Sequence, residues 1–119
     1  MTDVPVRKEG TRATSANYIE NIFTMLEYVV EALGTFLFLS TILTVVKAKS
    51  AIAPLLIGLV LTAMIAWGGR VSGGHFNPAV SFMFFLNKTI SAEVLSGFVL
   101  SQLLGATLAW QFVELSTNA

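Results

Sequence analysis

The residues best suited to chemistry lie in one stretch, Ser-Gly-Gly-His-Phe-Asn-Pro-Ala at positions 72–79. An asparagine before a proline is typical of a helix start. The asparagine side chain caps free backbone N–H groups there, and proline lacks the N–H that would go unpaired. Such a cap leaves the side-chain NH2 of Asn77 available as a donor. His75 is the only histidine, and it is either a neutral hydrogen-bonding strut that fixes this stretch or a pH gate.

Other chemistries are excluded by the residue inventory. The chain has no cysteine and one histidine, so it lacks the ligands of a typical zinc site and has no disulfide framework. The sequence contains no catalytic constellation, and we expect no enzyme activity, cofactor or metal. The net charge is zero, which gives no indication of a nucleic-acid partner.

The composition is that of a membrane protein. Hydrophobic residues make up 55% of the chain, charged residues only 12%, and the mean hydropathy is +0.76. A helix needs about 20 mostly apolar residues to cross a bilayer. Three segments meet this need approximately, and we expect spans at 26–46, 52–67 and 92–113.

Between the second and third spans lies a segment too short to cross. We expect a helix at 78–86, which would be roughly 13 Å long and reach about halfway through the hydrocarbon core. The glycine-rich run 68–74 before it argues against a helix interior. Irregular backbone is tolerated at membrane depth only inside protein or along a water-filled cavity. These features predict a re-entrant half-helix; the alternative is a polar surface loop followed by an interfacial helix.

The chain ends are more polar. Half of the fourteen charged residues lie within the first 27 positions. We expect a polar tail over 1–25 and a polar end over 114–119. Apolar residues at helical spacing in 18–26 indicate a short helix on the membrane surface; a tail that merges into the first span is the alternative.

Two features inside the expected spans indicate contacts with other parts of the protein. Glu31 lies inside the first span, and a carboxylate there has either a structural or a permeant-contacting role. Small residues recur at every fourth position of the third span, a pattern that allows close helix packing: Gly97, Ser101, Gly105 and Ala109.

Together these residues resemble the aquaporin, or major intrinsic protein, family. The run 72–81 is similar to the first of that family's two Asn-Pro-Ala loops. The first span around Glu31 and the third span around Gln102 are similar to the corresponding family spans. The resemblance covers about 28–112 and one repeat only. Val80 stands where the second-repeat loop usually has arginine, so the loop is of the first-repeat type.

The resemblance implies a fold and roles for individual residues. The fold is all-α, with three transmembrane helices and one re-entrant half-helix. Asn77 would donate into the pore beside Pro78 and Ala79, while Gly73 and Gly74 supply turns and backbone carbonyls along its wall. The supporting residues are Glu31, which would accept backbone N–H bonds from the loop, together with Ser72 and Gln102.

The resemblance also implies a selectivity filter. Its position on the second span is Ile57, twenty residues before Asn77. If two copies pair in inverted orientation, we expect one constriction holding two Ile57 and two Val80 side chains. Without arginine or an aromatic residue, this filter would suit small neutral solutes such as glycerol better than strict water selectivity.

One repeat cannot enclose a pore, so partners are expected. The second repeat would come from an inverted identical chain in a homo-oligomer or from a separate partner chain. Alternatively, the chain is truncated, or it is a non-conducting membrane module that binds other proteins. Positive charges flanking the spans favour a cytoplasmic N-terminus by five to two: Arg7, Lys8, Arg12, Arg70 and Lys88 against Lys47 and Lys49.

Overall fold

Over residues 9–119 the protein folds into four helices joined by short connections. The computed structural model describes the backbone from Glu9 to Ala119 and side chains from Thr14 onward. The helices are α1 (Glu9–Lys47), α2 (Ala53–Ser72), α3 (Pro78–Leu86) and α4 (Ala92–Thr117). Three of them, α1, α2 and α4, are long and apolar enough to cross a membrane. The expected all-α fold, with three spans and one short helix, is therefore confirmed.

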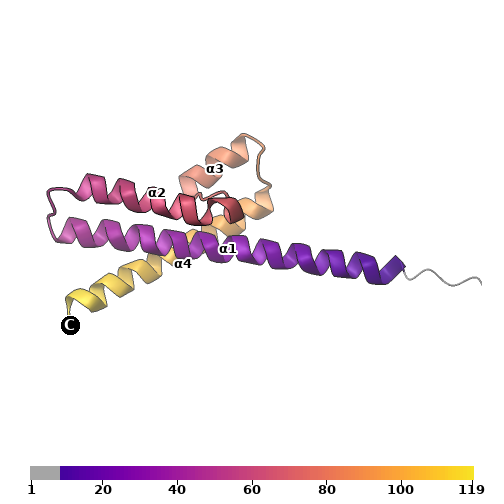
Figure 1. Ribbon diagram of the computed structural model, residues 1–119, viewed down its shortest axis with the longest axis horizontal. Coiled ribbons are helices and arrows are strands. Elements are labelled where there is room, and N and C mark those ends of the chain that lie inside the picture. The colour runs from indigo at the N-terminus through magenta and orange to yellow at the C-terminus, as the bar shows by residue number, and fades with distance from the viewer. Residues whose placement is uncertain (1–8) are drawn as a thin grey trace, which may run out of the picture.

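The long helix α1 is the element against which the others are arranged. Both α2 and α4 pack on α1, and α3 packs on α4. Among the described helices, α2 packs against neither α3 nor α4. Figure 1 shows α2 lying beside the C-terminal half of α1, while α3 slants away above the C-terminal end of α2. One side of α2 and α3 is thus left uncovered.

Residues 9–25 were expected to form a polar tail, with either a surface helix or a stretch that merges into the first span. In the structure they are the continuous N-terminal part of α1. The stretch Thr14–Lys47 qualifies as a span, because the apolar residues at 18–26 extend the apolar surface of the first span. The part of the expected tail over 1–8 lies outside the described residues.

Two helices extend beyond the residues expected for their spans. The second span was expected at 52–67, or longer if Gly68 and Gly69 extend it, and α2 continues through both glycines to Ser72. Gly68 is buried against Val30 of α1, where a β-carbon would lie 2.6 Å from the valine Cγ1. Close helix packing therefore offsets the low helix propensity of glycine. At the other end of the chain, α4 continues to Thr117, so the expected polar end is mostly helical.

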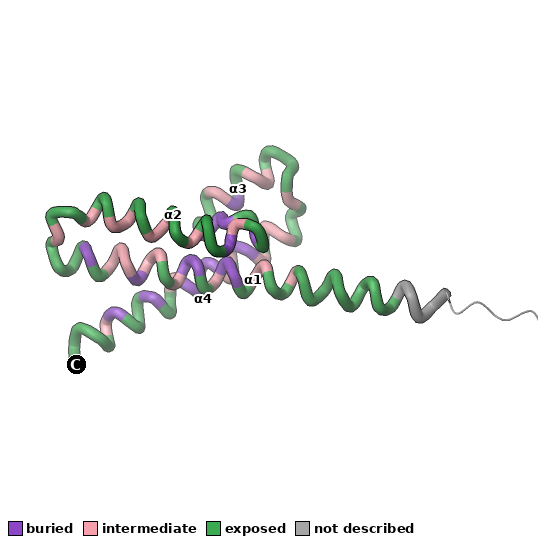
Figure 2. Tube along the Cα trace, viewed as in Figure 1, coloured by how far each residue is buried: buried purple, intermediate pink, exposed green. Residues whose placement is uncertain are grey.

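Burial is concentrated where α1, α4 and the segment before α3 meet. Figure 2 shows buried residues clustered there, whereas the N-terminal part of α1 and most of α2 are exposed. Large apolar side chains on these exposed faces include Phe23, Leu55 and Leu59. In a bilayer such faces are covered by lipid or by another chain.

The α1–α4 contact depends on small residues. A β-carbon at Gly105 would overlap the carbonyl oxygen of Ala32, and one at Gly97 would overlap the ring of Tyr28. Ala109 on the same row is also buried. The small residues of α4 therefore face α1 and allow the two backbones to approach closely.

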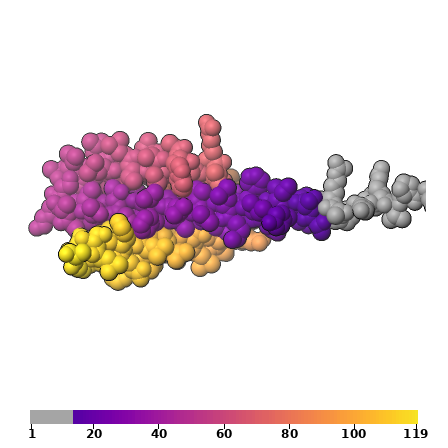
Figure 3. All heavy atoms as spheres, turned by 60° about the horizontal axis from the view of Figure 1, so that its bottom comes forward, coloured from indigo at the N-terminus to yellow at the C-terminus, as the bar shows by residue number. Residues whose placement is uncertain are grey.

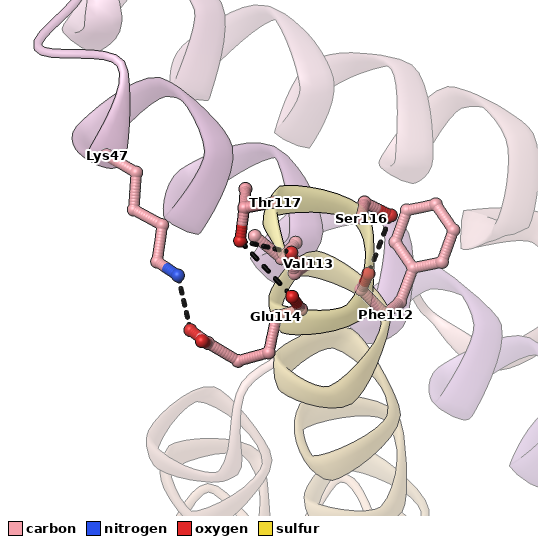
Figure 4. A network of polar contacts seen from close by, with 6 residues as sticks. All are labelled: Lys47, Phe112, Val113, Glu114, Ser116 and Thr117. Carbon is pink, nitrogen blue, oxygen red and sulfur yellow. Dashed lines mark hydrogen bonds and ion pairs between the residues drawn. The ribbon is translucent and has the colours of Figure 1, made fainter. Parts of the chain in front are cut away.

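The two helices are also joined near their C-terminal ends. Lys47 forms an ion pair with Glu114, and Figure 4 shows the two side chains reaching toward each other. Beside them, the hydroxyls of Ser116 and Thr117 donate to carbonyls of the preceding turn. The ion pair is partly exposed, so its net contribution to stability is small.

We expect Gly105→Ala to destabilise the fold by about 1–3 kcal/mol, because the added methyl group overlaps backbone rather than a movable side chain. Gly58→Ala is the matched control, since nothing lies within 4 Å of its β-carbon position. Thermal unfolding in detergent, followed by far-UV circular dichroism, measures both. Equal stability of the two variants would contradict the packing described for α1 and α4.

Candidate functional site

The segment between α2 and α3 turns back sharply. Gly73 and Gly74 have φ angles of 89° and 66°, a region that glycine enters without strain. Phe76 also has a positive φ, of 49°, which is uncommon for a residue with a bulky side chain. Such a conformation persists only when the surrounding structure holds it in place. The segment 73–76, here called the loop, is therefore held by its surroundings.

The buried carboxylate of Glu31 is the centre of those surroundings. Its Oε1 accepts hydrogen bonds from the Ser72 hydroxyl at 2.6 Å and from the backbone N–H of His75 at 2.9 Å. Its Oε2 accepts from the backbone N–H of Phe76 at 2.6 Å and from Gln102 Nε2 at 2.9 Å. One side chain of α1 thus binds the end of α2, the loop and α4. Each oxygen receives two donors, so the charge is well solvated by the protein.

A second group of bonds joins the loop to α3 and α4. Ser81, fully buried on α3, lies 3.0 Å from His75 Nδ1 and accepts from Gln102 Nε2 at 2.8 Å. The His75 ring stacks on Phe84, with centroids 4.6 Å apart, and meets the edge of Phe98. The ring is therefore enclosed by protein. His75 is only 6% exposed, so its imidazole does not reach the exposed side of the loop.

The ring of Phe76 fixes the loop from the opposite direction. It is 1% exposed and lies against two glycines. A β-carbon at Gly34 would overlap it, and one at Gly68 would lie 3.2 Å from it. These glycines of α1 and α2 make room for the aromatic ring, and their packing complements the hydrogen bonds to Glu31.

The Asn-Pro-Ala turn lies on the exposed side of this assembly. Asn77 Oδ1 accepts from the backbone N–H of Ala79 at 2.9 Å and caps α3. Within the described part of the chain, no group accepts a hydrogen bond from Asn77 Nδ2. Asn77, Pro78 and Ala79 are all exposed. The start of α3 therefore presents a free donor and a positive helix end to the uncovered side of the chain.

The two expected filter residues lie in different parts of the chain. Ile57 is near the start of α2, and the helix rises about 22 Å between it and Ser72. Val80 is in the first turn of α3, and α3 runs away from the start of α2 (Figure 1). The expected constriction of two Ile57 and two Val80 side chains involves a second chain, so it stays a prediction.

Several residues of the site were not singled out from the sequence. Ser81 links His75 to Gln102, and it is the only polar residue in the otherwise apolar run from Ala79 to Leu86. This position could have been singled out from the sequence, because a lone hydroxyl in a buried apolar helix needs a hydrogen-bond partner. Gly34 and Phe76 form a contact between distant positions, which periodicity alone does not reveal.

Comparison with known proteins gives consistent matches. A sequence profile described as Major intrinsic protein matches residues 20–119. Glycerol uptake facilitator protein-like 6 of Lactiplantibacillus plantarum is 39% identical over 99 residues, covering 80% of this chain and 45% of that protein. Aquaporin NIP3-1 of Arabidopsis thaliana is 52% identical over 52 residues, covering 44% of this chain and 16% of that protein. The chain thus matches less than half the length of each of these relatives. No solved structure gives a significant match.

We expect Glu31→Gln to loosen the loop, because the amide nitrogen cannot accept the hydrogen bonds that a carboxylate oxygen accepts. Leaving buried donors unpaired should cost about 3 kcal/mol, or roughly a hundredfold in the equilibrium for local opening. Hydrogen exchange should accelerate at the amides of His75 and Phe76. Glu27→Gln, one helical turn earlier, should leave these amides unchanged. Unaltered exchange in Glu31→Gln would show that the carboxylate does not hold the loop.

Proposed function

The chain belongs to the major intrinsic protein family, and on this premise we propose that it supplies half of a passive channel. The permeants would be water and small neutral solutes of the glycerol type. The observation that carries the proposal is the capped start of α3, where Asn77 uses Oδ1 for the helix cap and leaves its NH2 free. The chain would act as an integral, multi-pass membrane protein.

The start of α3 would act on permeants through hydrogen bonding and charge. The free NH2 of Asn77 would bind the oxygen of a water molecule or a hydroxyl group. The positive end of the α3 dipole would raise the energy of a cation at the same point. This use of half-helix ends is a principle best known from aquaporin-type channels themselves. Neutral solutes would pass, whereas cations would be disfavoured.

A second repeat is needed to close the pore. The half-helix α3 is only nine residues long, or about 13 Å. The Asn-Pro-Ala turn is exposed, and α2 packs only against α1 among the described helices. In a membrane these polar groups need protein or water around them rather than lipid. We propose that another repeat covers this side and brings a second capped half-helix to meet the first.

The partner we favour is a second copy of the chain in inverted orientation. Counting only charges close to the spans, three positive residues stand against two, which is a weak orientation bias: Arg12, Arg70 and Lys88 against Lys47 and Lys49. Insertion in both directions is therefore physically allowed. A separate chain carrying the other repeat would fill the same role. A non-conducting module that binds membrane proteins is the candidate from a different functional class.

In the inverted pair we expect two equivalent constrictions. Each would combine Ile57 of one chain with Val80 of the other, since these residues lie at different depths within one chain. Neither side chain carries charge or hydrogen-bonding groups. The filter would therefore be apolar and would admit glycerol as well as water.

We expect vesicles containing only this chain to shrink faster in hyperosmotic solution than empty vesicles, with glycerol entering afterwards. Asn77→Asp keeps an oxygen for the helix cap but removes the donor and adds negative charge. A lost donor is worth about 1.4 kcal/mol, so water permeability should fall by roughly tenfold. Stopped-flow light scattering measures both rates.

The matched control is Asn87→Asp, at the exposed C-terminal end of α3. It makes the same chemical change at the opposite end of the half-helix and should leave permeability unchanged. Wild-type vesicles no more permeable than empty ones would rule out the homomeric channel. They would favour a separate partner repeat or a non-conducting module.

Dual orientation can be tested separately, because the chain has no cysteine. The variants Lys88→Cys and Lys49→Cys each place one cysteine in a connection between helices, and we expect these two connections at opposite membrane faces. If copies insert both ways, a membrane-impermeant maleimide should label about half of each variant from outside sealed vesicles. Complete labelling of one and protection of the other would exclude the inverted homomeric pair.

A further inference from the structure

Two buried side-chain oxygens at the contact between α1 and α4 lack hydrogen-bond partners among the described residues. One is Oγ1 of Thr35, a residue 2% exposed, and the other is Oε1 of Gln102, a residue 1% exposed. An unpaired polar atom in an apolar interior costs free energy, and buried water commonly binds such atoms. We propose that one water molecule is bound here, accepting a hydrogen bond from the Thr35 hydroxyl and donating one to Gln102 Oε1.

The amide of Gln102 is oriented so that its oxygen needs a separate donor. Its Nε2 donates to Glu31 Oε2 at 2.9 Å and to Ser81 Oγ at 2.8 Å. Turning the amide over would place Oε1 against the carboxylate, where no proton is available for a hydrogen bond. The oxygen therefore stays on the other side of the amide, and it can only accept.

The hydroxyl of Thr35 does not use the partner that threonine has elsewhere in these helices. Five other threonines donate to the carbonyl oxygen four residues earlier: Thr24, Thr41, Thr62, Thr107 and Thr117. Thr35 does not form the corresponding bond to the carbonyl of Glu31. Its hydroxyl thus remains a donor for a group that lies between the two helices.

The two oxygens belong to side chains about one helical turn apart on facing helices. Gln102 binds Glu31, and Thr35 follows Glu31 by four residues, on the same face of α1. The Cβ of Thr35 lies 3.1 Å from the position of a β-carbon at Gly105, three residues after Gln102 on α4. Figure 3 shows the atoms of α4 lying against α1 along much of its length. Because the two oxygens do not bond directly, a single water between them satisfies both.

The water holds the Gln102 amide in the orientation that serves the loop. With Oε1 bound, both hydrogens of Nε2 stay directed at Glu31 and Ser81, the two groups that bind the loop. Thr35 is then a positioning residue, which acts on the loop through the water and Gln102. Both residues that hold the water are buried, so the site is separate from the exposed Asn77 and from the proposed pore.

The test is NMR spectroscopy of the full chain in detergent micelles, with heavy nitrogen introduced only into glutamine side-chain amides. The chain has two glutamines, Gln102 and the exposed Gln111, and Gln111→Leu assigns the two signals. The Gln102 amide should show cross-peaks to water of opposite sign in laboratory-frame and rotating-frame Overhauser spectra. That pair of signs identifies a long-lived water and excludes proton exchange. The Gln111 amide, in ordinary contact with solvent, should lack it.

Variants of Thr35 test its part in holding the water. Thr35→Val keeps the shape of the side chain without the hydroxyl, and it should abolish the Gln102 cross-peaks. It should also speed hydrogen exchange at the Phe76 amide about fivefold, the equivalent of one neutral hydrogen bond. Thr35→Ser retains the hydroxyl and should preserve both properties. The matched control is Thr41→Val, whose lost hydroxyl binds only the carbonyl of Leu37, and it should also preserve both.

Each contrary outcome overturns the proposal. Absence of the cross-peaks from Gln102 in the wild-type chain would show that no water is bound, and this measurement requires no variant to fold. Cross-peaks that persist in Thr35→Val would show that Thr35 does not hold the water. Equal effects of Thr35→Val and Thr41→Val would indicate a general loosening of α1 instead of a specific site.

Discussion

A charge inside a membrane must be solvated by protein, and the carboxylate of Glu31 imposes that requirement on the whole chain. Its two oxygens need more donors than α1 itself can offer, because the backbone N–H groups of a helix are already engaged. The loop, the end of α2 and Gln102 of α4 provide them. Removing the carboxylate would leave the Ser72 hydroxyl and the backbone N–H groups of His75 and Phe76 without this acceptor, while Gln102 would keep only its bond to Ser81. The charge and its donors are therefore stable only together.

This arrangement also explains how an irregular segment is kept at membrane depth. The loop exposes backbone N–H groups that no regular element satisfies, and Glu31 accepts two of them. The unfavourable φ of Phe76 is tolerated because its N–H is bound and its ring fits between Gly34 and Gly68. The position and direction of α3 follow from these contacts. The exposed donor on Asn77 is thus held in position by buried groups.

The fold class could be predicted from the sequence because three long apolar segments and an Asn-Pro cap are local features. The length of α1 was not predicted, since the apolar residues over 18–26 fit a surface helix as well as a continuation of the span. The end of α2 was left open at its glycine pair, because helix propensity says nothing about packing against Val30. For the candidate site, Asn77 was identified by its local cap chemistry. Ser81 and Phe76 were not, because their importance comes from contacts with residues on other helices.

The distances along the sequence within the Glu31 cluster have a consequence for biosynthesis. Ser72 lies 41 residues after Glu31, and Gln102 lies 71 residues after it. During translation α1 therefore emerges from the ribosome before Gln102 of the last helix. A lone acidic residue at the centre of a nascent span opposes insertion by about 3 kcal/mol. The long apolar stretch Thr14–Lys47 offsets this cost, and the set of donors to the carboxylate is complete only when the last helix is made.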